Sequence, residues 1–338
     1  MAAVEMRVAT LDDYAAVLAL DPNNTIYSGN DYIPAVYKSW INDPNRVATV
    51  GVLDGKIVAF RLAYYIDDGQ TLLGMAARVD VNHRGTGAWR QIMHAFSPHE
   101  LRADVTRFAG ISLVEQWHKT KFKTSPTTHM SRAARLLMTR MGQVRQFNPA
   151  AISGKNQVGA LARSTDGAVC RSLSKAESLQ ALTNRENQWR LFPNKRIVCS
   201  IGLVSYRLLQ SNFRRIIEEN EVVATINSTG SECHSLSFGC GLEVHNGFQY
   251  SVHYYGSHPA DDVSDLVNHV MVHLQIAAKQ QTKEPLQLRI LFSPLMPRDD
   301  VTRALDQVPG HEKCALEWLP LAVYERDLVR ASAASAKL

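Results

Sequence analysis

A short turn at residues 83–87, His-Arg-Gly-Thr-Gly, combines the residue types that bind a phosphate. Glycines permit positive φ angles and a close approach of a ligand to the backbone, and Arg84 adds a fixed positive charge. A β-patterned run ending at Val81 precedes the turn, and an apolar helical run over 88–96 follows it. The start of such a helix presents unpaired N–H groups and the positive end of its dipole. The turn therefore predicts a phosphate or pyrophosphate site, although it lacks the Gly-Lys-Ser/Thr of a P-loop.

A glycine-containing loop at residues 27–32 carries the other candidate binding groups. Polar and aromatic residues in such loops are less often part of the core than those on helices. Tyr27, Asp31 and Tyr32 are therefore candidates for an acceptor pocket, with Asp31 able to pair with an ammonium or imidazolium group. Tyr37 and Trp40, on the helix that follows, are predicted to face the core.

Three further groups of polar residues have simpler structural explanations. His269 and His273 share one predicted helix, but no glutamate follows His269 as in a zinc-protease helix, so we predict no metal site. The carboxylates of Asp67 and Asp68 suit a hairpin turn, because Gly69 follows them. His83 either contacts a phosphate of the ligand or faces solvent, and the sequence leaves both options open.

The first half of the chain has the pattern of a small α/β unit. Thr10 and Asp13 predict a capping box at the start of its first helix. The predicted elements are a strand at 7–9, helices at 11–20 and 34–40, strands at 46–53, 56–66 and 70–81, a helix at 88–96, a strand at 105–109, a helix at 112–122, and apolar runs at 135–139 and 144–147.

The second half repeats the same order of elements after a linker rich in Asn, Ser, Gly and Ala. Predicted are strands at 197–201, 221–227, 233–240 and 248–255, helices at 206–219, 262–279 and 299–307, and strands at 286–292 and 316–324. This repetition predicts a second, diverged copy of the fold. Asp261 and Asp262 stand where the first copy has its glycine turn, and their charges would repel a pyrophosphate. The second copy is therefore predicted to be non-catalytic.

Composition narrows the class of protein. The 338 residues suit two domains, and no run of about 18 apolar residues predicts a membrane helix. The net charge is +5 and the Lys and Arg residues are scattered along the chain, so we expect neither a nucleic-acid nor a membrane partner. The five cysteines form no C-x-x-C pair, which favours reduced thiols in an intracellular protein, and the N-terminus has no secretory leader pattern.

The turn resembles the acetyl-CoA signature of the GNAT N-acetyltransferase superfamily, Arg/Gln-x-x-Gly-x-Gly/Ala, with Arg84 and Gly87 at its first two positions. Trp89 stands at the third, where the family has a small residue. Residues 26–40, IYSGNDYIPAVYKSW, resemble the histidine N-acetyltransferase (N-acetyltransferase 16-like) branch. The likeness continues in register to Arg78-Val79 and ends near residues 137–142. Met75 departs from that branch, which carries a glutamate suited to relaying a proton at this strand position.

This resemblance implies a mixed, mostly antiparallel sheet flanked by helices, in two tandem GNAT-like domains of which the second is degenerate. It places the catalytic domain at 1–147, a linker at 148–170, the degenerate domain at 171–328 and a flexible tail at 329–338. It implies that acetyl moves from acetyl-CoA to the α-amine of a small, histidine-like amino acid, without a metal. The general base stays unassigned, with Tyr27 and Asp31 as candidates. The implied acetyl-CoA-binding residues are Arg78, Val79, Val81, Arg84, Gly85, Thr86, Gly87 and Ala88.

Two other functions remain open. Met75 and Trp89 also suit an altered or inactive acyl-CoA-binding or scaffold protein, and a protein N-terminus is an alternative acceptor. The expected location is cytoplasmic, with the peroxisome as the alternative, because the terminal Ala336-Lys337-Leu338 is close to Ser-Lys-Leu. The preferred amino acid and the oligomeric state are not determined by the sequence.

Overall fold

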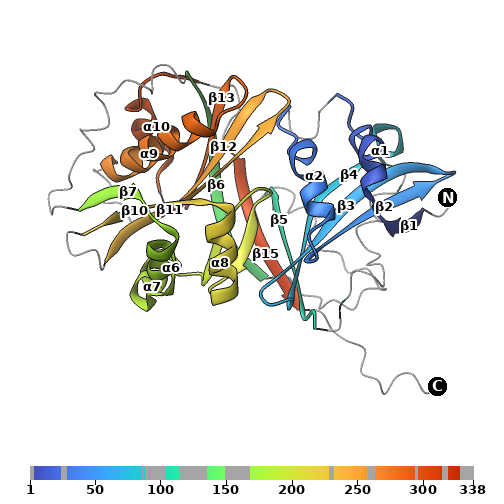
Figure 1. The fold of residues 1–338 in the computed structure, drawn as a ribbon, viewed down its shortest axis with the longest axis horizontal. Helices are drawn as coiled ribbons and strands as arrows, with labels where there is room; N and C mark the ends of the chain where they lie inside the picture. Colours follow the sequence, from blue (N-terminus) through green and yellow to red (C-terminus); the bar gives the residue numbers. More distant parts are fainter. Residues whose placement is uncertain are drawn as a thin grey trace. The chain divides into compact units, whose positions relative to one another are not determined.

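The structure, a computed structural model, describes most of the chain. Its described residues are 4–23, 29–85, 87, 91, 102, 104–113, 135–148, 168–227, 232–256, 263–293, 296–313 and 319–327. The chain divides into two compact units, Met1–Leu137 with Ala322–Leu338, and Met138–Leu321. Each unit is described by itself below, with the labels of Figure 1.

The first unit is built on a six-stranded sheet. Among its first five strands in spatial order, three neighbouring pairs are antiparallel and one is parallel. In spatial order the strands are β1 (Glu5–Val8), β2 (Arg46–Leu53), β3 (Lys56–Ile66), β4 (Thr71–Val79), β5 (Arg107–Leu113) and β15 (Leu319–Asp327). Strands β1 to β4 pair antiparallel, and β4 pairs parallel with β5. The short helices are η1 (Leu11–Asp13), α1 (Tyr14–Leu18), α2 (Ile33–Ile41) and η2 (Val81–His83).

Local sequence signals account for the turns of this unit. Asp54 and Gly55 join β2 to β3 with φ angles of 49° and 77°, as the Asp-Gly hairpin signal predicts. Asp67, Asp68 and Gly69 all have positive φ angles and join β3 to β4, which confirms the predicted hairpin turn. The predicted bounds of β2 and β3 agree with the structure, and those of β4 differ by one or two residues at its ends.

The second unit is also built on a six-stranded sheet. In spatial order its strands are β6 (Arg135–Phe147), β13 (Leu286–Phe292), β12 (Gly247–Gly256), β11 (Cys233–Val244), β10 (Glu221–Ile226) and β7 (Val169–Ser172). The helices are α6 (Lys175–Thr183), α7 (Arg185–Leu191), α8 (Gln210–Glu219), α9 (Ser264–Gln280) and α10 (Arg298–Asp306). Strand β14 (His311–Lys313) pairs with β6, and β8 (Arg196–Cys199) with β9 (Val204–Arg207). Figure 1 shows α9 and α10 on one face of this sheet and α6 to α8 on the other.

The order β10, β11, β12, α9, β13, α10 matches the predicted repeat, and its parallel pair β12–β13 corresponds to β4–β5. One prediction in this half is wrong: the helix expected at 206–219 begins at Gln210, because Val204–Arg207 pairs with β8. The two apolar runs at 135–139 and 144–147 form the single strand β6.

Each unit contains one strand from outside the residue span predicted for it from the sequence. Strand β6 belongs to the sheet of the second unit, whereas β15, far along the chain, lies next to β5 in the first. Hydrophobic patterning locates strands but does not identify their partners, so this exchange left no signal in the sequence.

Candidate functional site

The turn after β4 is fixed by Asp80. Its Oδ1 accepts hydrogen bonds from the backbone N–H of Asn82 and from His83 Nδ1, both at 2.9 Å. Burial opposes the charge on Asp80, but these hydrogen bonds and the neighbouring His83 hold the pKa of Asp80 below its usual value. His83 therefore has a partner within the protein.

Arg84 and two glycines with positive φ angles follow, and Nη2 of Arg84 lies 3.8 Å from Oδ1 of Asp21. Gly85 and Gly87 have φ angles of 80° and 90°, and a Cβ at Gly85 would meet no atom within 4 Å. Arg84 donates from Nε to the carbonyl of Val79 at 3.3 Å, and its side chain is 43% exposed. The N–H of Gln91 donates to the carbonyl of Gly87 at 3.1 Å, as in the first turn of a helix. Thr86, Ala88 and Trp89 lie outside the described residues.

Strand β4 contains a β-bulge that the sequence did not reveal. Phe60 of β3 is opposite Arg78, but Leu62 is opposite Met75, so two residues of β4 face a single residue of β3. One of them, Ala76, is buried and has a φ angle of 53°. A left-handed conformation in a residue with a Cβ costs about 1–3 kcal/mol and is typical of functional sites. The bulge removes part of β4 from regular pairing, next to the turn.

Strands β4 and β5 pair only over their first residues. Their parallel register runs from Thr71 opposite Arg107 to Gly74 opposite Gly110. Strand β4 continues to Val79 and β5 to Leu113, but these later residues are not part of the shared register. Backbone edges that do not pair with each other can pair with an extended ligand that carries amide groups.

A buried ion pair joins β4 to the loop that carries the predicted acceptor residues. Arg78 donates from both terminal nitrogens to the two carboxylate oxygens of Asp31, each at 2.8 Å. The two residues are 2% and 6% exposed. Asp31 Oδ1 also accepts the backbone N–H of Ile33 at the start of α2, at 3.0 Å. Asp31 was expected to pair with a substrate cation, and in the structure its partner is the guanidinium of Arg78.

The remaining predicted residues are partly brought together. The rings of Tyr32 and Trp40 lie 5.6 Å apart on α2 and the loop before it, while Val79 is buried and Val81 is 55% exposed. Tyr37 and Trp40 are 1% and 5% exposed, which confirms that they face the core. Tyr27 lies outside the described residues.

The second unit contains a polar network that includes His269 and His273. His269 and His273 are fully buried on α9, and the hydroxyl of Ser237 is hydrogen-bonded to both, at 2.6 and 2.8 Å. Asp265 accepts a hydrogen bond from Tyr254 at 2.6 Å. The described residues contain no group of three or more His, Cys, Asp or Glu side chains arranged to hold a metal ion. The histidines thus have protein hydroxyl partners.

The parallel pair of the second unit is closed by a side chain. Strand β12 pairs with β13 up to His253 opposite Leu291. Just beyond this level, Arg140 of β6 donates to the carbonyls of Tyr254 and Leu291 at 3.0 and 2.7 Å, and so bridges the two strands. Its guanidinium lies 4.3 Å from the ring centroid of Tyr255. Burial lowers the pKa of Arg140, which is 1% exposed. Asp261 and Asp262 lie outside the described residues.

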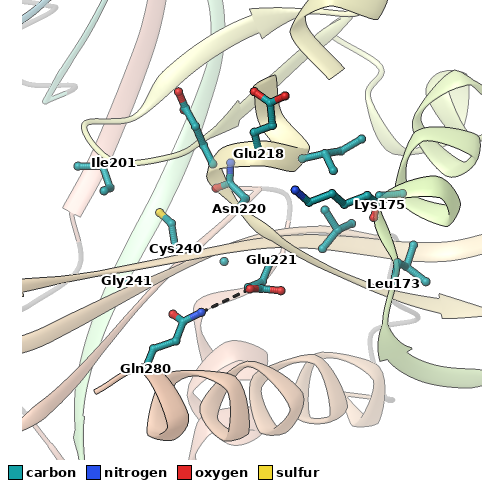
Figure 2. A pocket seen from close by; sticks show the side chains of 14 residues that line it. Leu173, Lys175, Ile201, Glu218, Asn220, Glu221, Cys240, Gly241 and Gln280 are labelled. Atoms are coloured by element: carbon teal, nitrogen blue, oxygen red, sulfur yellow. Dashed lines mark hydrogen bonds between the residues drawn. The ribbon is translucent and has the colours of Figure 1, made fainter. Parts of the chain in front are cut away.

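A cavity of about 400 Å³ in the second unit is lined by polar side chains of α6, α8, β10 and α9. Figure 2 shows Lys175, Glu218 and Asn220 around it, with Gln280 donating to Glu221 at 3.4 Å. None of the described residues of the predicted site lines this cavity. A cavity of about 420 Å³ in the first unit has Asp80, the residue that fixes the turn, in its wall.

Comparisons with known proteins give partial sequence matches. No family model matches the chain. Over 86 residues it is 37% identical to the histidine N-acetyltransferase of Oreochromis niloticus, a match that covers 25% of each protein. It is 38% identical over 80 residues to the human probable N-acetyltransferase 16, covering 24% of this chain and 21% of that one. The chain thus spans about a quarter of the length of these relatives or less.

The solved structures match over nearly the whole chain. A tandem GNAT protein from the clavulanic acid biosynthesis pathway, determined without acetyl-CoA, has a TM-score of 0.54. The match has 11% sequence identity and covers 97% of this chain and all of that one. The chain therefore has a tandem GNAT fold, with one GNAT-like domain in each unit. Within that class, its sequence resembles the histidine N-acetyltransferase branch. Within the described residues, no helix is long and apolar enough to cross a membrane.

Proposed function

We propose that the chain is an N-acetyltransferase that moves acetyl from acetyl-CoA to the α-amine of a small, histidine-like amino acid. One arrangement carries this proposal: a bulged strand that leaves its parallel neighbour and leads into a turn with Arg84 and two positive-φ glycines. The sequence relatives, named histidine N-acetyltransferases, support the choice of acceptor.

The residues of the turn fit an acyl-CoA. Arg84 is half-exposed, and the space at Gly85 lets a pyrophosphate approach the backbone. The edge of β4 between Met75 and Val79 offers amide pairing to the pantetheine arm, which carries two amides. Because the side chain of Arg78 is bound to Asp31, its contribution to this arm comes from the backbone.

The chemistry needs few groups from the protein. The neutral amine attacks the thioester carbonyl and the C–N bond forms. The C–S bond then breaks, and the proton that the attacking nitrogen loses goes to the departing CoA thiolate. Backbone N–H groups at the bulge stabilise the oxyanion, a contribution usually worth about 10²–10³-fold in rate. The ammonium proton leaves before the attack, and Met75 cannot accept it. We infer that the proton passes to water or to a group of the acceptor loop.

Binding of acetyl-CoA tests the donor site. Arg84→Ala removes charge-assisted hydrogen bonds and should weaken binding about ten- to a hundred-fold. Gly87→Val places a β-branched residue at a φ of 90° and should weaken it at least as much. Arg171→Ala, a change to an equally exposed arginine of the second unit, is the control and should leave affinity unchanged. Full affinity in both turn variants, with folding intact, would refute the donor site.

The absence of a carboxylate at Met75 supports a second candidate, a non-catalytic acyl-CoA-binding protein. A mass-spectrometric screen over free amino acids and N-terminal peptides separates the three functions. Turnover of free histidine or a similar amino acid supports the proposal, and turnover of peptides alone supports protein acetylation. Binding of acetyl-CoA without turnover of any amine supports the binding protein.

We further propose a cytoplasmic location, with peroxisomal import through Ala336-Lys337-Leu338 as the alternative. A fluorescent protein that ends in residues 327–338 distinguishes the two. Punctate signal that disperses when Leu338 is deleted supports import, and a diffuse signal in both cases supports the cytoplasm.

A further inference from the structure

Two aromatic rings lie across the last pair of residues that β4 and β5 share. A Cβ built at Gly74 would lie 3.0 Å from Cζ of Phe108, and one at Gly110 would lie 2.5 Å from Cζ of Tyr324. The two rings have centroids 6.4 Å apart. Phe108 and Tyr324 are 6% and 7% exposed, and Gly110 is buried. The glycines therefore leave room for the rings, not for a ligand.

Both rings lie on the same face of the sheet. Phe108 and Gly110 are two residues apart on β5, so their Cβ directions coincide, and each glycine has its ring on the Cβ side. Gly74 is opposite Ala63, one residue along β3 from Leu62 and thus on the other face. The buried pair Arg78–Asp31 is reached from the face of Phe60, which packs on Tyr37 of α2. The rings and the acceptor loop thus occupy opposite faces.

The two rings lie farther along β4 from the glycine turn than the bulge does. From Val79 back to Met75, β4 advances four residues, about 13 Å at about 3.3 Å per residue. An acyl-CoA held by its pyrophosphate at the turn and extended along this edge brings its thioester to the level of the bulge at Ala76. Beyond this level come Gly74 and Gly110, where the two backbones pair and the rings fill the face. Each added acyl carbon would have to displace them.

We propose that Phe108 and Tyr324 limit the acyl group to two or three carbons. This inference rests on the proposed function, and it names the donors that the site accepts: short, unbranched acyl-CoA thioesters. The two rings come from distant parts of the sequence, because Phe108 lies on β5 and Tyr324 on β15, which follows the second unit in the chain. Both rings pack over glycine in a sheet, an arrangement that also serves stability alone. A specificity ratio separates the two roles.

The test uses the full chain with acetyl-, propionyl-, butyryl- and hexanoyl-CoA and one amino-acid acceptor. For the wild type, kcat/KM should fall at least tenfold between acetyl- and butyryl-CoA, since one methylene changes specificity about 10–200-fold. Tyr324→Ala should raise the butyryl-to-acetyl ratio at least tenfold, and Phe108→Leu should raise it less. Tyr324→Leu, which keeps more of the packing volume, replaces Tyr324→Ala if that variant does not fold.

Tyr65→Ala is the matched control, because Tyr65 is a buried tyrosine on the same face whose opposite residue is Leu72, two positions from Gly74. It should lower stability and leave the ratio unchanged. Equal use of acetyl- and butyryl-CoA by the wild type, or an unchanged ratio in both Tyr324 variants, overturns the inference and leaves the proposed function standing. If turnover is absent, dissociation constants of the four thioesters replace kcat/KM. If none of them binds, both the inference and the proposed function fail.

Discussion

The two units share an order of elements but differ at the strand pair that would meet a ligand. In the first unit, β3 and β4 pair around a bulge at Ala76. In the second, β11 and β12 pair without interruption from Ser235 opposite Gly256 to Val244 opposite Gly247. A regular ladder uses its backbone groups within the sheet, and a bulge releases some of them. The same topology therefore occurs once with a bulge that interrupts the strand pairing and once with an uninterrupted pair.

The neighbouring parallel pairs repeat this contrast. Strands β4 and β5 share four residue pairs, whereas β12 and β13 share six and are then bridged by Arg140. The guanidinium satisfies carbonyls that an extended ligand would otherwise contact. The predicted loss of function in the second unit thus has a candidate cause besides Asp261 and Asp262, in a residue that sequence reasoning did not single out.

The largest loss of stability is expected when Asp31 is replaced. Asp31→Asn leaves the buried Arg78 without its counter-charge and should lower the free energy of unfolding by about 3–5 kcal/mol. Asp300→Asn, which removes an exposed ion pair with Arg303 in the second unit, should cost about 0–1 kcal/mol. Urea denaturation, with hydrogen exchange at β4, measures both. If Asp31 instead binds substrate only, the asparagine variant will keep wild-type stability and show a raised KM.

Deleting Ala76 would convert the bulged strand into a ladder like that of the second unit. The deletion leaves one residue of β4 opposite one of β3, so turnover should fall about 10²–10³-fold. Stability should be retained or rise, because a strained conformation worth about 1–3 kcal/mol is removed. Ala76→Gly keeps the bulge, relieves the strain and should keep the activity. Wild-type kcat/KM in the deletion variant would show that the bulge plays no part in catalysis.

Acid should destabilise the second unit more than the first. Burial lowers the pKa of both His253 and His273 well below that of a free histidine, with nearby positive groups adding to the shift. Because the unfolded chain then binds more protons, the free energy of unfolding falls as pH drops below about 6.5. Two such histidines give a slope of roughly 2.7 kcal/mol per pH unit.

Urea denaturation at several pH values between 7.5 and 5 measures this slope. Replacing His253 and His273 by Gln should each remove about half of it. A flat profile over this range would contradict the assignment of both histidines as neutral.

Much of the first unit could be predicted because its signals are local. The turn at Asp67-Asp68-Gly69, the Thr10–Asp13 cap and the bounds of β2 and β3 depend on neighbouring residues, and the structure has each of them. The positive φ angles of Gly85 and Gly87 likewise follow from residue type. In the second unit, Ser174 and Glu177 form another local capping box, with Ser174 N–H donating to the Glu177 carboxylate at 2.8 Å.

The features that were missed depend on contacts between distant residues. Ala76 has nothing in its type that indicates a positive φ, and the bulge follows from how β3 and β4 align. Asp31 was identified as the partner of a cation, but its partner is 47 residues away. Arg140 was read only as part of a family-like segment, because a buried arginine that binds carbonyls has no sequence pattern.

The place of β15 in the first unit has a consequence for how the protein is made. Strand β5 has only four residue pairs with β4, and its other neighbour, β15, is synthesised more than two hundred residues later, at 319–327. At about 5–20 residues per second, a ribosome needs on the order of tens of seconds for that interval. During this time β5 is an open sheet edge, which is the kind of surface that chaperones protect and that nascent chains aggregate through. The first unit to be translated is therefore the last to be completed.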